Sequence, residues 1–220
     1  MSSNSVAADL PVEADELVRE LLARGSESRV DYKAPMSLPK DAHGRAKLAK
    51  HVIGLSNRKD GGDLLIGVDD ATFSAIGLTQ ADASTWDAAK ITSSLSSYSA
   101  PSPVVQVVLG RLADGKLLVA VHVVPFAEQP LVCTKSLKEN DKWVVRAGAL
   151  YIRTEGTETK EITTESEMRE LLDRAYIKKS ERLLHQIKEL IDAHWPGTTL
   201  PNTQSLLAAI DDDLAAMALP

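Results

Sequence analysis

Apolar residues run almost without interruption through residues 64–68. A strand that is covered on both faces carries such a run, whereas a strand with one exposed face alternates apolar and polar residues. We therefore predict a buried, central strand. Gly61 and Gly62 precede it and permit backbone conformations that other residues avoid, and Asp69 and Asp70 follow where the strand leaves the core.

Polar and apolar residues alternate with period two over residues 29–33. This pattern predicts a short strand, because successive side chains of a strand point to opposite faces. Val30 and Tyr32 should point into the core, and Asp31 and Lys33 should share the other face.

Three further stretches have apolar residues at helical spacing. The first predicts a helix over residues 12–24, and the second predicts a helix over residues 41–57 that begins with a capping aspartate and turns its apolar stripe to the sheet. The third helix should begin at a cap formed by Asp82 or Ser84 and continue to about Ser97.

An Asp-Gly pair at residues 114–115 stands between two apolar runs. This is a strong local signal for a β-hairpin, so we expect residues 104–112 and 117–124 to pair antiparallel. The remaining predicted strands are shorter than those of the hairpin. They are extended segments at 131–134, 143–145 and 150–153, with a charged turn over 135–142.

The pattern changes after residue 163. Thr164 and Glu167 form a capping box, which predicts a helix that reaches at least Tyr176 and extends as far as His194. A final helix is predicted over residues 202–217. These helices either cap the core or provide a surface for oligomerisation or a protein partner, and the sequence leaves both options open.

The length of 220 residues suits one domain of about 150 residues with an appendage. We predict a disordered segment over residues 1–10, a domain over 11–163 and a helical extension over 164–220. Hydrophobic residues make up 44% and charged residues 25%, as in soluble globular proteins. No apolar run reaches the roughly 18 residues of a membrane helix, and the polar start lacks the features of a signal peptide, so we expect a cytoplasmic protein.

The chain has one cysteine, Cys133, which excludes an internal disulfide. A lone cysteine also provides no cluster of thiolate ligands for a metal, and it suits a reducing compartment. We expect Cys133 to act as a small apolar residue in a strand.

The net charge of -6 argues against a uniformly basic nucleic-acid binder, but it allows a basic face on an acidic body. Basic residues crowd one early segment, where they form either a phosphate-binding face or ordinary solvated surface. His51, in the same segment, is either a partly exposed surface histidine or a ligand. The basic residues of this segment are Lys33, Lys40, Arg45, Lys47, Lys50, Arg58 and Lys59.

Several catalytic motifs are absent. The sequence contains no GxxxxGK[ST], no GxGxxG opening a helix, no HExxH and no paired CxxC. A P-loop ATPase is therefore not expected. The sequence also lacks a GxSxG elbow, which argues against acyl transfer.

Carboxylates are the remaining candidates for chemistry. Asp31 and Asp69 could bind Mg²⁺ or Mn²⁺ if they lie on neighbouring strands and point the same way, and Lys33 could hold a phosphate. Glu27 would lie ~13 Å from Asp31 along an extended strand, too far for one shared metal unless the chain bends. The alternative is that these residues are turn carboxylates and a surface ion pair.

Four motifs, in order, resemble the Schlafen AlbA-like domain family. They are an acidic-aromatic-lysine strand, a helix that ends near Ala-Asn in the family, a GG strand that ends in Val-Asp, and a late Tyr-Ile-Arg. The likeness covers roughly residues 15–165 of this chain. The corresponding segments here are 28–33, 55–57, 61–70 with 76–78, and 150–153.

The resemblance implies an α+β fold, with a mostly antiparallel sheet flanked by helices, to which this chain adds a C-terminal helical extension. Many members of the family bind nucleic acid, and some animal Schlafens cleave RNA with a metal ion. In full-length Schlafens two such lobes form a horseshoe around RNA. This chain has one lobe, and a homodimer would rebuild the pair.

Three carboxylates serve the family's nucleases. Asp31 and Asp69 match the second and third acids, but Ser26 stands at the position of the first, and Glu27 is one residue away. Asp31 also replaces the usual glutamate, and Tyr32 the usual phenylalanine. These departures favour binding over catalysis.

Our leading hypothesis is a homodimeric nucleic-acid-binding module. The alternative is an endoribonuclease that uses Mg²⁺ or Mn²⁺ on Asp31 and Asp69, with help from Glu27 and Lys33, and a third option is a non-catalytic regulatory subunit. No other cofactor is expected. The predicted phosphate contacts are Lys33, Lys40, Arg45, Lys47, Arg58 and Arg153.

Overall fold

The computed structural model describes residues 12–25, 29–154 and 158–194. The chain forms two compact units, Met1–Leu172 and Asp173–Pro220. Three sequence predictions lie outside the described residues, so the structure does not bear on them. They are the disordered segment 1–10, the helix over 202–217 and the position of Glu27.

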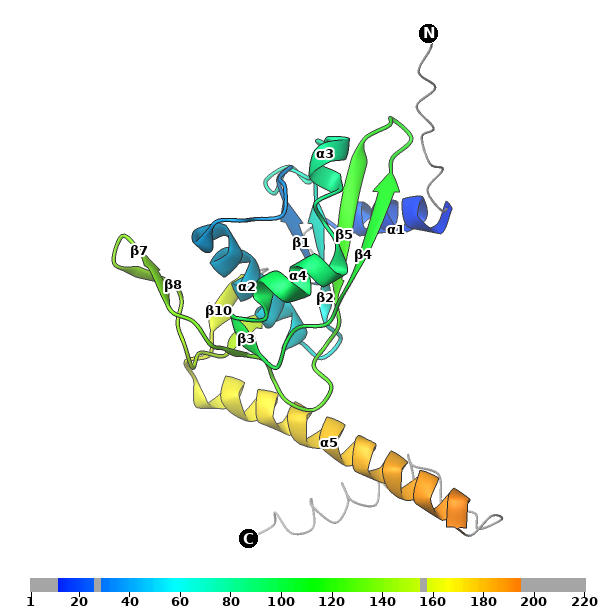
Figure 1. Ribbon diagram of the computed structural model, residues 1–220, viewed down its shortest axis with the longest axis vertical. Coiled ribbons are helices and arrows are strands. Elements are labelled where there is room, and N and C mark those ends of the chain that lie inside the picture. Colours follow the sequence, from blue (N-terminus) through cyan, green and yellow to red (C-terminus); the bar gives the residue numbers. More distant parts are fainter. Residues whose placement is uncertain (1–11, 26–28, 155–157, 195–220) are drawn as a thin grey trace. The chain divides into compact units, whose positions relative to one another are not determined.

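Four strands form the central sheet of the first unit, in the order β1–β2–β5–β4 (Figure 1). Strand β1 (Val30–Lys33) runs parallel to β2 (Gly62–Ile66), whereas β5 (Leu117–Val123) is antiparallel to both β2 and β4 (Val105–Arg111). Every residue of β2 is buried, and β2 has a strand on each side. The predicted central strand and the predicted α+β fold with a mainly antiparallel sheet are confirmed.

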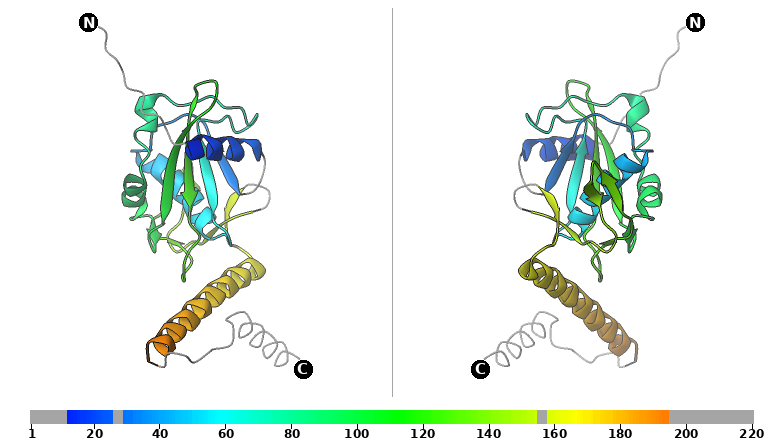
Figure 2. Two further views of the ribbon diagram at one scale, coloured as in Figure 1. Left: turned by 90° about the vertical axis from the view of Figure 1, so that its right-hand side faces the viewer. Right: turned by 90° about the vertical axis from the view of Figure 1, so that its left-hand side faces the viewer.

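Helix α1 (Val12–Ala23) covers one face of the sheet, and helix α2 (Ala42–Ser56) covers the other (Figure 2). Val18 of α1 packs in a core cluster with Val30 and Tyr32 of β1. These two residues of β1 therefore point into the core on the α1 side, as their spacing predicts. Asp31 and Lys33, the alternate residues of β1, must therefore face α2, because side chains of a strand alternate between the two faces of the sheet.

The prediction of one continuous third helix is wrong. The structure has two short helices in this region, α3 (Gln80–Ala83) and α4 (Ala88–Leu95). Thr79 caps α3 and Asp87 caps α4, where each side chain accepts a hydrogen bond from a backbone N–H of its own first turn. Trp86, which is buried, lies in the segment between the two helices.

The predicted hairpin of β4 and β5 is confirmed, with the turn at residues 112–116. The predicted charged turn over 135–142 is wrong, because it contains a strand. Strand β7 (Leu137–Glu139) pairs antiparallel with β8 (Lys142–Val145). Asn140 and Asp141 link the strands with φ angles of 46° and 61°, a conformation that Asn and Asp tolerate better than most residues.

Two short pairs complete the first unit. Strand β3 (Ser99–Ala100) pairs with β6 (Val132–Cys133), and β9 (Tyr151–Arg153) pairs with β10 (Thr159–Glu161). Cys133 is free and buried, as expected of a small apolar residue in a strand. The sequence did not predict β10, because Thr-Lys-Glu has no apolar alternation.

Helix α5 (Glu165–His194) begins in the first unit and continues into the second. In the first unit, Leu171 is fully buried. In the second unit, Tyr176, Leu183 and Leu190 are exposed apolar residues at a spacing of seven. Of the helices that the structure describes, none is long and apolar enough to cross a membrane.

Candidate nucleic-acid interface

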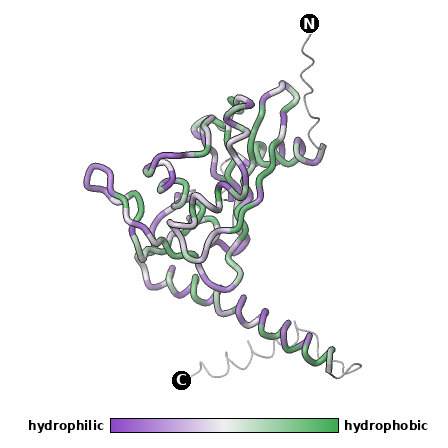
Figure 3. Tube along the Cα trace, in the orientation of Figure 1, coloured by the Kyte–Doolittle hydropathy of each residue, from purple (hydrophilic) through white to green (hydrophobic). Residues whose placement is uncertain are grey.

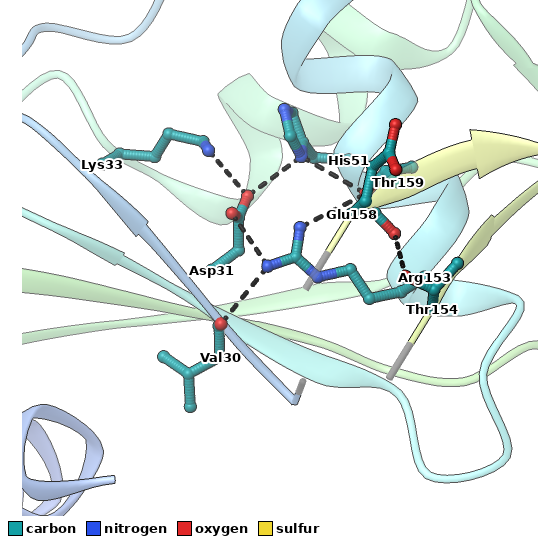
Figure 4. A network of polar contacts seen from close by, with 8 residues as sticks. All are labelled: Val30, Asp31, Lys33, His51, Arg153, Thr154, Glu158 and Thr159. Atoms are coloured by element: carbon teal, nitrogen blue, oxygen red, sulfur yellow. Dashed lines mark hydrogen bonds and ion pairs between the residues drawn. The ribbon is translucent and has the colours of Figure 1, made fainter. Parts of the chain in front are cut away.

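Asp31 is a buried carboxylate on β1, with only 4% of its surface exposed. It points away from the core that lies under α1, toward α2 and the β9–β10 pair (Figure 4). Three nitrogen-bearing side chains reach its oxygens. Lys33 Nζ lies 2.8 Å and His51 Nδ1 3.0 Å from Oδ2, and Arg153 Nη2 lies 3.1 Å from Oδ1. The prediction that Asp31 and Lys33 share a face is confirmed, but the alternative of a surface ion pair is wrong because Asp31 is buried.

Arg153 links β9 to β1. Its guanidinium is buried, and it donates hydrogen bonds to the Val30 carbonyl and to Thr159 Oγ1, each at 3.4 Å. Through these contacts and the Asp31 ion pair, Arg153 joins the β9–β10 pair to the four-stranded sheet, with which that pair shares no backbone ladder. This burial limits direct contact between Arg153 and a ligand.

His51 comes from the side of α2 that does not carry the buried stripe. Lys47, Lys50 and His51 recur at helical spacing, so they project from a common side of the helix. Gly54 lies one turn after Lys50 and packs so closely on β10 that a Cβ there would meet Thr159 Cγ2 at 2.5 Å. This close approach brings His51 within reach of Asp31.

The charge state of Asp31 follows from these contacts. Burial on its own would raise the pKa of this carboxyl, since a buried charge loses its hydration. The hydrogen bond and charge of His51, with the charges of Lys33 and Arg153, outweigh burial and hold the pKa well below its usual range. Asp31 is therefore a carboxylate at neutral pH, with its oxygens directed at cations.

Two cavities adjoin this network, and they share Lys50 and His51. The first, of about 410 Å³, is lined by Asp31 and Arg153. The second, of about 420 Å³, lies between α2 and the β7–β8 hairpin. The first is also lined by Lys33, Asp70, Phe73, Glu158 and Thr159, and the second by Lys47, Glu139, Asn140, Lys142, Trp143 and Val144.

The structure brings together some of the predicted phosphate contacts. Lys33 and Arg153 line the first cavity, and Lys47 lines the second. The remaining three lie elsewhere on the first unit: neither cavity is lined by Lys40, Arg45 or Arg58.

The side chain of Asp69 accepts hydrogen bonds from residues of the turn that follows β2. Its Oδ1 accepts hydrogen bonds from the backbone N–H groups of Ala71 and Thr72, at 3.1 and 2.8 Å, and from Thr72 Oγ1 at 2.8 Å. The bonds from Thr72 lower the pKa of Asp69. Its neighbour Asp70, and not Asp69, lines the cavity that contains Asp31.

The carboxylates do not form a metal site as they stand. Among the described residues, no group of three or more His, Cys, Asp or Glu side chains could hold a metal ion. A cation at Asp31 would have to displace Lys33 or His51, which occupy Oδ2.

A second acid–histidine pair lies elsewhere on the sheet. Asp63 of β2 is cross-strand partner to His122 of β5, and Asp63 Oδ1 lies 2.8 Å from His122 Nδ1. Arg29 Nε lies 3.8 Å from the other oxygen of Asp63. The pair accounts for buried Asp63 as a structural residue that joins neighbouring strands.

His51 is partly exposed, as one of its two alternatives predicts, and its Nδ1 also pairs with Asp31. Thr159, whose Oγ1 lies 3.4 Å from His51 Nδ1, is a site residue that the sequence did not predict. The spacing of Lys47, Lys50 and His51 along the unburied side of the predicted helix was an available signal that these residues act together.

Comparisons with known proteins give a family match. The family model described as Schlafen, AlbA_2 matches residues 27–163. A search of curated proteins finds no match. Among solved structures, a crystal structure of the DIP2311 protein from Corynebacterium diphtheriae is similar, with 20% sequence identity and a TM-score of 0.45 over 68% of this chain. The match covers 26% of that protein, so this chain spans about a quarter of its length.

Proposed function

The chain belongs to the Schlafen AlbA_2 family, and we propose that it binds nucleic acid through the basic residues around its two adjoining cavities. We call Lys33, Lys47, Lys50, His51 and Lys142 the basic groove. Membership of the family supports nucleic-acid binding in general. The assignment to this groove, and the choice of residues, is our proposal.

The observation that carries the proposal is the convergence of cations from separate elements. Lys33 comes from β1, Lys47 and Lys50 from α2, and Lys142 from β8, yet the cavities they line share residues. Five Lys and Arg side chains, these four lysines and Arg153, line the two cavities against the four carboxylates of Asp31, Asp70, Glu139 and Glu158. The lining therefore has a small positive excess on a protein whose net charge is -6. A local basic face of this kind suits a ligand with regularly spaced phosphates.

Asp31 and Arg153 have a supporting role in this proposal. Both are buried, and each satisfies the charge of the other. The Asp31 carboxylate holds Lys33 and His51 in place, so it orients two members of the basic groove. Asp70 and Glu158, which also line the first cavity, would repel phosphates that approach too closely.

Fluorescence anisotropy with labelled RNA and DNA across a salt series tests the proposal. Each phosphate contact that is lost should lower the slope of log K against log salt by about 1. Lys47→Ala and Lys50→Ala should each have this effect, whereas Lys90→Ala, on exposed Lys90 of α4, should leave the slope unchanged. If the wild-type protein binds neither RNA nor DNA at low salt, the proposal is wrong.

A homodimer and a cytoplasmic location remain part of the proposal. The exposed apolar residues Tyr176, Leu183 and Leu190 of α5 are candidates for the dimer contact, because their spacing of seven residues is typical of paired helices. Sedimentation of Leu183→Glu and Leu190→Glu tests this. A wild-type protein that sediments as a monomer would contradict the dimer.

The metal-dependent endoribonuclease remains a prediction from the family resemblance. It requires the side chain of Lys33 or His51 to move away from Asp31. Incubation of structured RNA with the protein and Mn²⁺ checks this, and Asp69→Ala should abolish any cleavage. Cleavage that persists in that variant would show that Asp69 is not a metal ligand.

A further inference from the structure

The β7–β8 hairpin carries an exposed tryptophan. The hairpin projects from the body of the first unit (Figure 1), and its tip is hydrophilic (Figure 3). Trp143 on β8 nevertheless exposes 50% of its surface. Trp86, by contrast, is buried and donates a hydrogen bond from its indole N–H to the Met36 carbonyl. Trp143 is therefore not accounted for by the core.

The surroundings of Trp143 are cationic. Lys138 Nζ lies 4.4 Å from the centroid of the Trp143 ring, a distance at which a cation interacts with the ring face. Trp143 also lines the second cavity together with Lys47, Lys50 and Lys142. The indole thus belongs to a surface with several lysines.

The charge of this surface selects an anionic ligand. Glu139 is the one carboxylate among the described residues that line the second cavity, and its Oε1 lies 3.5 Å from His43 Nε2. Three lysines therefore face a single carboxylate that already has a partner. A cationic or neutral apolar ligand would leave these lysines without a counter-charge.

An aromatic ring among cations matches the two chemical parts of a nucleotide. The lysines attract the phosphates, and the face of an indole stacks on a base, with a contribution of about 1 to 3 kcal/mol for each base. An acidic peptide or a free phosphate would use the lysines but give Trp143 no partner. A duplex hides its base faces in the helical stack, so the ring favours an unpaired base.

We propose that Trp143 stacks on an unpaired base of single-stranded nucleic acid whose phosphates contact Lys47, Lys50 and Lys142. This inference rests on the nucleic-acid binding proposed above, and it adds a substrate class and a residue that determines it. Lys138 lies over one face of the ring, and the half-exposed ring also lines the second cavity, where a base would reach it.

The test compares a labelled single-stranded oligonucleotide with an abasic oligonucleotide of the same length and charge. Trp143→Ala should weaken binding of the oligonucleotide with bases by about 5- to 150-fold. The same substitution should change abasic binding less than about 2-fold, because the abasic strand offers only phosphates and sugars. Trp143→Phe should retain most of the affinity, since phenylalanine also stacks.

Two controls keep the result specific. Val104→Ala removes another exposed apolar side chain, and it should not change the affinity for either oligonucleotide. Thermal unfolding of Trp143→Ala should remain cooperative, with a midpoint within about 5 °C of the wild type, because half of the ring is exposed.

The outcomes separate the two proposals. If the wild type binds no strand at low salt, nucleic-acid binding itself fails. If the wild type binds but Trp143→Ala weakens both oligonucleotides equally, or neither, stacking on Trp143 is wrong and binding through phosphates stands. Tighter binding of polyglutamate than of either oligonucleotide would also overturn the stacking proposal, because an acidic peptide would then be the better ligand.

Discussion

Nδ1 of His51 lies 3.0 Å from Oδ2 of Asp31, and this contact connects helix α2 to strand β1 beside the buried sheet. Asp31 cannot be regarded as a free acid, because Arg153 holds its other oxygen. The carboxylate at the position that resembles a nuclease acid is instead the centre of an ion-pair network. The Asp31 carboxylate should therefore contribute to the stability of the first unit, and it orients the side chains of Lys33 and His51.

Asp31→Asn should destabilise the first unit by about 3 to 5 kcal/mol. The substitution removes the counter-charge of Arg153, whose guanidinium then remains buried without a carboxylate. Urea unfolding monitored by circular dichroism measures the loss. Asp114→Asn, which changes an exposed ion pair with Lys116, is the matched control and should cost less than about 1 kcal/mol. Equal effects of the two substitutions would contradict the structural role of Asp31.

The stability of the first unit should fall in acid in a way that depends on Asp31. Its pKa is lowered in the folded state, so the unfolded chain binds the proton more tightly. The contribution is therefore fully present above the ordinary carboxyl pKa of about 3.9, and it is lost progressively as the pH falls below that value. Urea unfolding at a series of pH values below 5 should give a flatter dependence for Asp31→Asn than for the wild type. Parallel curves would contradict this prediction.

Gly54→Ala should destabilise the protein although alanine favours helices. The new Cβ would lie 2.5 Å from Thr159 Cγ2, so the helix and β10 would have to separate at a cost of about 1 to 3 kcal/mol. Thr159→Ser removes that methyl group and keeps the hydroxyl oxygen that lies 3.4 Å from His51 and Arg153. In the Thr159→Ser background, Gly54→Ala should cost nothing, or gain up to about 1 kcal/mol. A double-mutant cycle in urea measures the coupling, and additive effects would refute the close contact.

The four strands of the central sheet and the first two helices could be predicted because their signals are local. The apolar run of β2, the alternation of β1 and the Asp-Gly turn between β4 and β5 each depend on a few neighbouring residues. The extended segment at 143–145 was predicted and forms most of β8, but its partner β7 was not, because Leu-Lys-Glu is mostly charged and the turn is Asn-Asp, without the glycine that marks the commonest two-residue turns.

The site was predicted less well than the fold, because it is built by pairing across the chain. Asp31, His51 and Arg153 lie on three separate elements, and their pairing depends on how α2 and β9 pack against β1. Asp31 and Arg153 each lie in a motif of the family, but nothing in the sequence indicates that their charges neutralise each other. The sequence also gives no sign that Asp69 bonds to its own turn, since an aspartate after a strand is compatible with both roles.

Asn57, the residue after α2, should be among the most sensitive polar residues of the first unit. It is fully buried and makes three hydrogen bonds. Its Nδ2 donates to the carbonyls of Leu131 and Tyr151, at 3.0 and 2.9 Å, and its Oδ1 accepts from the Leu131 N–H at 2.8 Å. Asn57→Ala would leave three buried backbone groups unpaired, so we expect a loss of about 3 kcal/mol or more.

Two substitutions sharpen the test of Asn57. Ser56→Ala removes a single hydrogen bond, which the hydroxyl donates to the Val124 carbonyl, and should cost about 1 kcal/mol. Asn57→Asp keeps the shape and the acceptor but loses both donated bonds, so it should destabilise at least as much as Asn57→Ala at neutral pH. Urea unfolding of the three variants gives the order. If Asn57→Asp were as stable as the wild type, the two donated bonds would not contribute, and the position would matter only for packing.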